Sequence, residues 1–456
     1  MLSDRPHGPS GERSAGAIAE GTRDPSGGLR SFARPSHGPR RMPLERPVEE
    51  NCWELAPGLY RILLPLPWDV PFVNAYLVRA PGGWILIDAG ADTPASLRAL
   101  GWALKAVGVP EGGLTAILLT HRHPDHAGDV IAVQQRWGGT VYVHPAEREL
   151  DRADPGVLTA WLAFTGMPPE VMETLLRRAE RMPLPPDAIP YPAMPAAAGV
   201  GRGGGRPDGD VPSASGVAPD CSPLDASPRE TSAGDAPTGD AHGAGATVPG
   251  LSAGDETAER AERVPVTTFS VAGLPLEVVY TPGHSPGHVM LRVPETGWVF
   301  TGDHVLPRAG INVWANPVGL ANPMGTYLDN LAAVRHLDRI WGMDAREARP
   351  GADEDRATRG LVLPGHGLPW SGPMMPQAAA LVDWHRQAAL ALRNRLPDEP
   401  GPTVFEIVAA RRPEDAREKP HRLRGAVAET LAFLLWMESE GLVGRQGEAP
   451  ARWYRR

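Results

Sequence analysis

Residues 118–129, LLTHRHPDHAGD, place several side chains that could bind a metal just after an apolar run. His121 and His123 alternate, so both can point to one side of an extended segment. Asp125 and His126 follow a proline that holds the turn. Neutral imidazole and carboxylate are ligands that zinc and iron accept. Four such side chains within six residues favour a metal site over a structural role.

Further candidates lie downstream, each where an apolar strand is expected to end. They are His284 and His288 in VVYTPGHSPGH, Asp303 and His304 in WVFTGDHV, and His366 in LVLPGHG. Upstream, WILIDAG ends with Asp88, a residue suited to a core only if it accepts hydrogen bonds. Glycines beside these residues let the backbone bend tightly and approach a metal.

The elements that must position these residues form two strand-rich halves. Strands are predicted at 58–66, 74–80, 83–90, 115–120, 140–145, 266–273, 274–281, 287–294, 297–305 and 361–367. Helices are predicted at 93–109, 127–139, 168–182, about 324–341 and 376–396. Thr93 is the expected N-cap of the first helix, with Pro94 in its first turn. This pattern predicts helices covering the outer faces of stacked sheets.

The order Asp88, HRHPDH, PGHSPGH, TGDH and PGHG resembles the metallo-β-lactamase fold superfamily in all five motifs. The resemblance covers roughly 55–192 and 264–370. It implies an α+β fold, a four-layer αβ/βα sandwich with a metal pair at the edge of the two sheets.

The resemblance also assigns residues to two divalent metal ions, with zinc as the expected metal. His121, His123 and His284 would hold one ion, Asp125, His126 and His366 the other, and Asp303 would bridge them. Asp88 would fix the histidine loop by hydrogen bonds. His284 is preferred to His288 because family members keep the histidine directly after Pro-Gly, which leaves His288 a packing role.

Several residues are candidates for substrate binding. His304 either orients substrate or is a partly buried histidine beside the site. The loop LPRAGINVWANPVG carries Arg308, Asn312 and Trp314, which suit an anionic or polar substrate, or else form a lid and surface. Trp68 is a candidate for the pocket rim.

The implied chemistry is attack by a metal-bridging hydroxide, in which Asp125 and Asp303 take part. The bridging aspartate resembles glyoxalase II-like and ribonuclease Z-like members, and a small thioester or ester is the first expectation. An endoribonuclease or phosphodiesterase acting on single-stranded RNA is the second. A winged-helix regulator that binds nucleic acid and uses the metals for sensing is the third.

Composition sets the remaining expectations. A composition rich in glycine and proline predicts two disordered segments. They are an N-terminal extension at 1–47 and an insertion at 193–263. The insertion interrupts a domain at 48–372, and 373–456 predict a small winged-helix-like domain. The net charge of −9 argues against a protein that coats nucleic acid. Two cysteines, no signal peptide and no apolar run of about 18 residues predict a cytoplasmic protein that does not cross a membrane.

Overall fold

A computed structural model describes residues 51–68, 70–149, 155–177, 184–192, 264–307, 311–343, 359–399 and 401–456. The predicted extension 1–47, the predicted insertion 193–263 and Arg308 lie outside these residues. Among the described helices, none is both long enough and apolar enough to cross a membrane.

Seven strands form the first sheet, in the order in which they occur along the chain. They are β1 (Cys52–Ala56), β2 (Leu59–Pro65), β3 (Phe72–Ala80), β4 (Gly83–Ile87), β5 (Leu114–Leu118), β6 (Thr140–Val143) and β7 (Ile189–Pro190). Strands β1 to β4 are antiparallel neighbours, and β4 to β7 run parallel. The strands predicted in this half are all present.

Six strands form the second sheet, in the order β13-β12-β11-β10-β9-β8. They are β8 (Val266–Val271), β9 (Leu274–Tyr280), β10 (Val289–Val293), β11 (Trp298–Gly302), β12 (Leu361–Pro364) and β13 (Trp370–Ser371). Only β11 and β12 pair in parallel, so their carboxyl ends meet at one edge of this sheet.

The helices of the N-terminal half are α1 (Pro94–Val107), α2 (Pro124–Ala127), α3 (Val130–Trp137), α4 (Pro145–Glu149), α5 (Pro155–Phe164) and α6 (Pro169–Arg177). Helix α1 starts as predicted, because the Thr93 side chain accepts a hydrogen bond from the Ser96 N–H at 3.1 Å. It ends at Gly108, whose φ of 89° suits glycine.

The helices of the C-terminal half are α8 (Pro323–Ile340), α9 (Met375–Arg393), α10 (Val404–Arg411), α11 (Pro413–Glu418), the 3₁₀ helix η5 (Pro420–Leu423) and α12 (Arg424–Ser439). A hairpin of β14 (Val443–Gln446) and β15 (Arg452–Arg455) completes the chain. Helices followed by a hairpin were expected in this region; the name winged helix stays a prediction.

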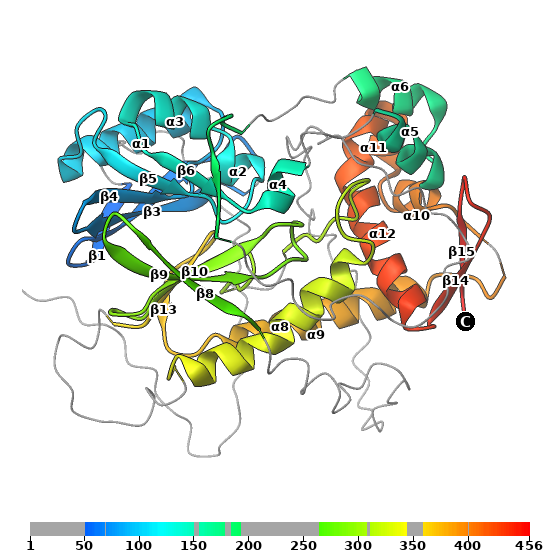
Figure 1. The fold of residues 1–456 in the computed structure, drawn as a ribbon. Helices are drawn as coiled ribbons and strands as arrows, with labels where there is room; N and C mark the ends of the chain where they lie inside the picture. The colour runs from blue at the N-terminus through cyan, green and yellow to red at the C-terminus, as the bar shows by residue number, and fades with distance from the viewer. Residues whose placement is uncertain are drawn as a thin grey trace, which may run out of the picture. The chain divides into compact units, whose positions relative to one another are not determined.

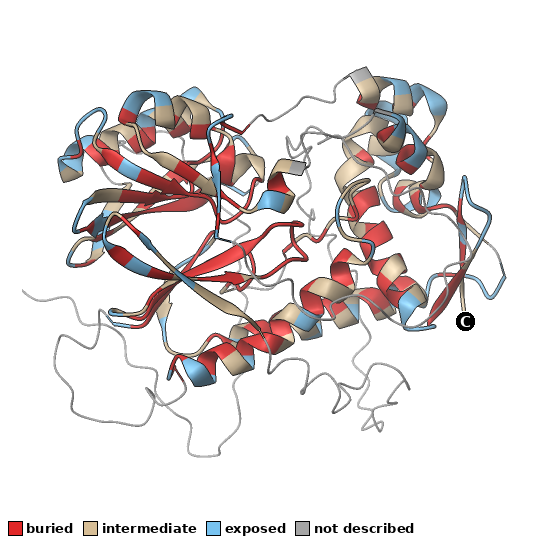
Figure 2. Cartoon of the chain, viewed as in Figure 1, coloured by how far each residue is buried: buried red, intermediate tan, exposed pale blue. Residues whose placement is uncertain are grey.

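Three buried clusters join four layers. Leu100 of α1 and Val133 of α3 pack on the outer face of the first sheet, and Figure 1 shows both helices on that face. Val78 and Val278 lie in the cluster between the two sheets. The outer face of the second sheet packs against α8 and α9, with Leu331 in the cluster. The strands between the helices are mostly buried (Figure 2), and the predicted αβ/βα sandwich is confirmed.

The C-terminal elements share the cluster under the second sheet rather than having a core of their own. Phe433 of α12 and Trp453 of β15 belong to the same buried cluster as Trp161 of α5. A main-chain hydrogen bond joins the Phe405 N–H to the Thr165 oxygen, so α10 is fixed directly to the end of α5. The loop after β11 contacts α12, because the Ala315 N–H donates to the Ala428 oxygen at 3.0 Å.

Candidate metal centre

The parallel strands bring the motif residues to one end of the sandwich. Asp88 follows β4, and His121 and His123 follow β5, which runs beside it. Asp303 and His366 follow β11 and β12, the parallel pair of the second sheet. Because the carboxyl ends of parallel strands lie at the same edge, these loops converge.

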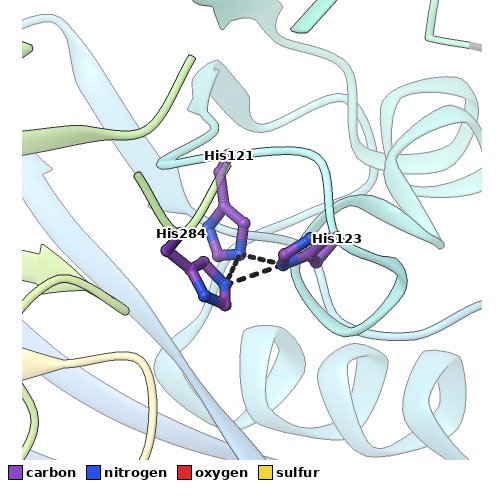
Figure 3. A group of neighbouring side chains, drawn as sticks. All are labelled: His121, His123 and His284. Atoms are coloured by element: carbon purple, nitrogen blue, oxygen red, sulfur yellow. Dashed lines mark hydrogen bonds between the residues drawn. The ribbon is translucent and has the colours of Figure 1, made fainter. Parts of the chain in front are cut away.

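Three imidazoles form the first group. The distance between His121 Nε2 and His123 Nδ1 is 3.1 Å, that between His123 Nδ1 and His284 Nε2 is 2.7 Å, and that between His284 Nε2 and His121 Nε2 is 3.2 Å. Figure 3 shows the three rings turning these nitrogens toward a common point. Two nitrogens bound to one tetrahedral zinc ion lie about 3.3 Å apart, so the triangle has nearly the size that such an ion needs.

In His121 and His284 the ring nitrogen that faces away from the group is Nδ1, and its hydrogen bond fixes the tautomer of the ring. His284 Nδ1 lies 2.8 Å from the main-chain oxygen of Asn312, which can only accept, so the proton is on Nδ1. The Thr120 hydroxyl donates to Asp88, so it accepts from His121 Nδ1 at 3.0 Å. Both Nε2 lone pairs therefore face each other, an arrangement that is repulsive unless a cation lies between them.

Burial keeps this group neutral. It lowers the pKa of His123 to about 3, with His284 adding to the effect. It also lowers the pKa of His121 well below the ordinary value and lowers the pKa of His284. Neutral imidazole is the form that binds a metal, so these rings can bind one without first losing a proton.

The second group combines two imidazoles with two carboxylates. His366 Nε2 lies 3.0 Å from Asp125 Oδ2 and 3.5 Å from Asp303 Oδ2. His126 Nε2 lies 3.7 Å from Asp125 Oδ2 and 3.5 Å from Asp303 Oδ1. Among the described residues neither His126 Nε2 nor Asp303 Oδ1 makes a hydrogen bond, although both atoms are buried. Such orphaned atoms fit a bound cation.

Hydrogen bonds at Nδ1 also fix the tautomers of His126 and His366. His126 Nδ1 donates to Asp88 Oδ2 at 2.8 Å, and His366 Nδ1 donates to the Phe72 carbonyl oxygen at 3.0 Å. In the neutral form of each ring, which is the form that binds a metal, the Nε2 lone pair therefore points into the carboxylate group. In this structure Asp88 binds both the His126 ring and Thr120, as expected for a residue that supports the histidine loop.

The electrostatics of the second group favour a positive charge. Burial alone would lower the pKa of His126, but Asp303, Asp125 and Asp88 overcome it and raise the pKa well above its ordinary value. The pKa of Asp125 falls to about 2, because His126 and His366 outweigh the cost of burial. Asp125 and Asp303 are therefore carboxylates at neutral pH, and the geometry and charge together suit divalent metal ions.

Position 365, beside His366, requires glycine because the main chain there lies very close to the second group. A Cβ at this position would collide with Asp303 Oδ1 and with the His126 ring. Glycine therefore lets the loop after β12 lie directly against the second group.

Three supporting interactions were not predicted from the sequence. The buried carboxylate of Glu147 in α4 accepts hydrogen bonds from Ser285 Oγ and the Gly287 N–H, both at 2.6 Å, which clamps the loop that carries His284. Asn74 Nδ2 donates to the Pro364 oxygen at 2.8 Å and holds the loop before His366.

His288 is buried, as its predicted packing role requires, but it also holds the main chain of Asp303, a candidate ligand. Its Nε2 accepts a hydrogen bond from the Asp303 N–H at 3.1 Å, and its Nδ1 donates to Thr281 Oγ1 at 2.8 Å. No signal in the sequence distinguishes this contact from ordinary packing.

The substrate candidates are placed differently from one another. Trp314 lies beside the first group, with its ring centroid 5.5 Å from that of His123. Asn312 contributes its main-chain oxygen to His284. His304 is fully buried against Tyr327, at 5.5 Å between ring centroids. Trp68 is partly buried and packs on the core of the first sheet.

Comparisons with known proteins agree with this geometry. Residues 68–366 match the sequence profile of the Metallo-beta-lactamase superfamily. The chain is 43% identical over 67 residues to the probable metallo-hydrolase YqjP of Bacillus subtilis, covering 15% of this chain and 21% of that protein. It is 37% identical over 89 residues to a hydroxyacylglutathione hydrolase of Xanthomonas axonopodis pv. citri, covering 19% and 31%.

These matches span less than a third of each curated relative, so they do not transfer an activity. A crystal structure of a metallo-beta-lactamase family protein from Thermus thermophilus matches with a TM-score of 0.56 and 24% identity, covering 88% of this chain and all of that one. That likeness shows the fold. With the profile match extending over more than half of its length, the chain belongs to the metallo-beta-lactamase superfamily.

Proposed function

We propose that this protein is a hydrolase that uses two divalent metal ions, with zinc as the first expectation, on a small thioester or ester. The observation that carries the proposal is the set of inward-facing lone pairs on His121, His126, His284 and His366, each fixed by a hydrogen bond at the outer ring nitrogen. His121, His123 and His284 would hold one ion, and Asp125, His126 and His366 the other, with Asp303 between them.

When bound, the ions would lower the pKa of water and polarise the substrate oxygen. The chain's own residues would do the rest. The Asp125 side chain is 16% exposed against 6% for Asp303, so it can pass the proton released from water to bulk solvent. Water adds to the acyl carbon, the bond to sulfur or oxygen breaks, and the leaving thiol or alcohol takes up a proton.

Trp314 would cover the first group and limit water access to the acyl carbon, because its ring lies next to His123. The choice of a thioester or ester is supported by the curated relatives named hydroxyacylglutathione hydrolase, which share only a part of their length with this chain.

The test is metal analysis of the purified full chain followed by turnover assays. Two equivalents of metal and hydrolysis of S-D-lactoylglutathione or of a simple ester are expected, and both should be lost in His123→Ala. Cleavage of a short single-stranded RNA without ester turnover would replace the proposal with a phosphodiesterase. Tight binding of duplex DNA without any turnover would replace it with a regulator. A chain that binds no divalent metal would refute all metal-based functions.

A further inference from the structure

In the first group His123 is partly exposed, and the second group is open to solvent at His366 and Asp125. Their side chains are 19% and 16% exposed, whereas those of His126, Asp303 and His284 are 0%, 6% and 7% exposed. A substrate therefore reaches the second group past the loops that surround His366.

Two exposed apolar side chains occupy those loops. Leu368, two residues after His366, is 68% exposed, and Val70, in the loop between β2 and β3, is 47% exposed. We call these two residues the apolar rim. Aliphatic side chains on two loops beside a polar, charged site are suited to contact an apolar part of a ligand that is bound there.

Hydrogen bonds hold both loops of the apolar rim beside the metal centre. The Phe72 oxygen accepts from His366 Nδ1 at 3.0 Å, so the loop that carries Val70 ends directly at a ligand. The Leu66 N–H donates to the Pro71 oxygen at 2.9 Å and closes that loop at its base. Asn74 Nδ2 donates to the Gly367 oxygen at 2.9 Å and fixes the residue before Leu368.

Arg61 connects the loop of Leu368 to a third exposed apolar side chain, that of Trp53. Arg61 donates to the Gly367 oxygen at 3.1 Å, and its guanidinium lies 5.7 Å from the centre of the Trp53 ring. Trp53 is itself 41% exposed. Val70 and Leu368 are two of the five large hydrophobic side chains that are exposed among the described residues; the five are Trp53, Val70, Ile189, Ile340 and Leu368.

We propose that the apolar rim binds the acyl chain of the substrate, so that the enzyme acts on thioesters or esters of medium-length aliphatic acids. This inference rests on the proposed function for the bond that is broken. The scissile carbonyl lies at the metal centre, and the chain extends over Leu368 and Val70 toward Trp53. Full burial of one methylene group corresponds to about a fourfold gain in affinity, so a chain partly covered by the rim gains about twofold for each methylene.

The first experiment measures kcat/KM of the zinc-loaded full chain on p-nitrophenyl esters from acetate to octanoate. The value should rise about twofold for each methylene, and Leu368→Ser and Val70→Ser should flatten this rise, with losses that grow with chain length. Ile340→Ser is the matched control, because Ile340 is 49% exposed at the end of α8 and should leave the profile unchanged. Ester turnover with a flat profile, or equal losses at all chain lengths, would overturn the inference and leave the proposed function standing.

The second experiment does not depend on turnover. Calorimetry should show that octanoate binds the zinc-loaded protein at least tenfold more tightly than acetate, and that Leu368→Ser removes most of this difference. If no ester or thioester is hydrolysed but this preference is observed, the apolar ligand stands and the proposed reaction fails. Equal binding of the two carboxylates would overturn the apolar site whatever the reaction.

Discussion

Asp88→Asn should weaken binding of the second metal ion while leaving the fold intact. Asp88 accepts hydrogen bonds from the Thr120 N–H at 2.8 Å and from His126 Nδ1 at 2.8 Å. It has a φ of 59°, and asparagine tolerates this left-handed conformation. The substitution therefore changes the chemistry of one atom and keeps the shape of the backbone.

The magnitude follows from the main-chain donor and the imidazole donor, because the Thr120 hydroxyl can keep donating to the side-chain oxygen that is Oδ1 in Asp88, at 3.1 Å. An asparagine side chain offers one acceptor oxygen, and the Thr120 main-chain N–H cannot move its proton, whereas an imidazole can. The amide oxygen stays with Thr120, and the amide NH₂ group faces His126. The ring then moves its proton from Nδ1 to Nε2, where it replaces the lone pair needed for the metal. Returning to the metal-binding tautomer costs about 1–3 kcal/mol for a buried unpaired donor, so affinity should fall about 5- to 150-fold.

Competition with a chromophoric chelator measures this loss for each ion separately. The ion in the His121 group should be affected much less, and far-ultraviolet circular dichroism should be unchanged. Asp129→Asn is the matched control, because Asp129 is also buried, lies three residues after His126 and belongs to none of the candidate ligand groups. Wild-type affinity for two ions in Asp88→Asn would refute the tautomer argument.

Three further predictions use other parts of the centre. His123→Ala should lower metal content to one ion or none and abolish turnover, with helix content unchanged by circular dichroism; full activity would contradict the site. Glu147→Ala should lower the free energy of unfolding by about 2–6 kcal/mol in the presence of a chelator, because the Ser285 hydroxyl and the Gly287 N–H each lose a buried acceptor; chemical denaturation measures it, and a change below about 1 kcal/mol would show that the clamp is unimportant. Burial raises the pKa of Asp129 from 3.8 to about 7, so the native state keeps a proton that the unfolded state releases, and stability should fall as pH rises from about 4 to 7; Asp129→Asn should remove this part of the slope, and an unchanged slope would rule the residue out as its source.

Much of the centre could be predicted because its ligands lie in short motifs at strand ends. The spacing of His121, His123, Asp125 and His126 is local, and the structure brings these residues together with His284, Asp303 and His366. Asp88 was found for the same reason, as a carboxylate at the end of an apolar strand.

The interactions that support the candidate ligands could not be predicted, because they join parts of the chain that are distant in the sequence. Glu147 meets Ser285 across 138 positions, and Asn74 meets Pro364 across 290. In the sequence each resembles an ordinary polar residue of a helix or strand, and nothing local indicates that it is buried. His288 was assigned to packing because members of the family that the sequence resembles keep the histidine directly after Pro-Gly, and its hydrogen bond to the Asp303 N–H has no sequence signature.

The loop after β11 makes the metal centre depend on residues near the end of the chain. The Ala315 N–H donates to the Ala428 oxygen of α12 at 3.0 Å, and three positions earlier the Asn312 oxygen holds His284. A protein shortened to residue 366, where the family profile ends, would keep all seven candidate ligands and lose the anchor of one of them. Transplanting these motifs onto another sandwich would therefore require that α12 be carried along with them.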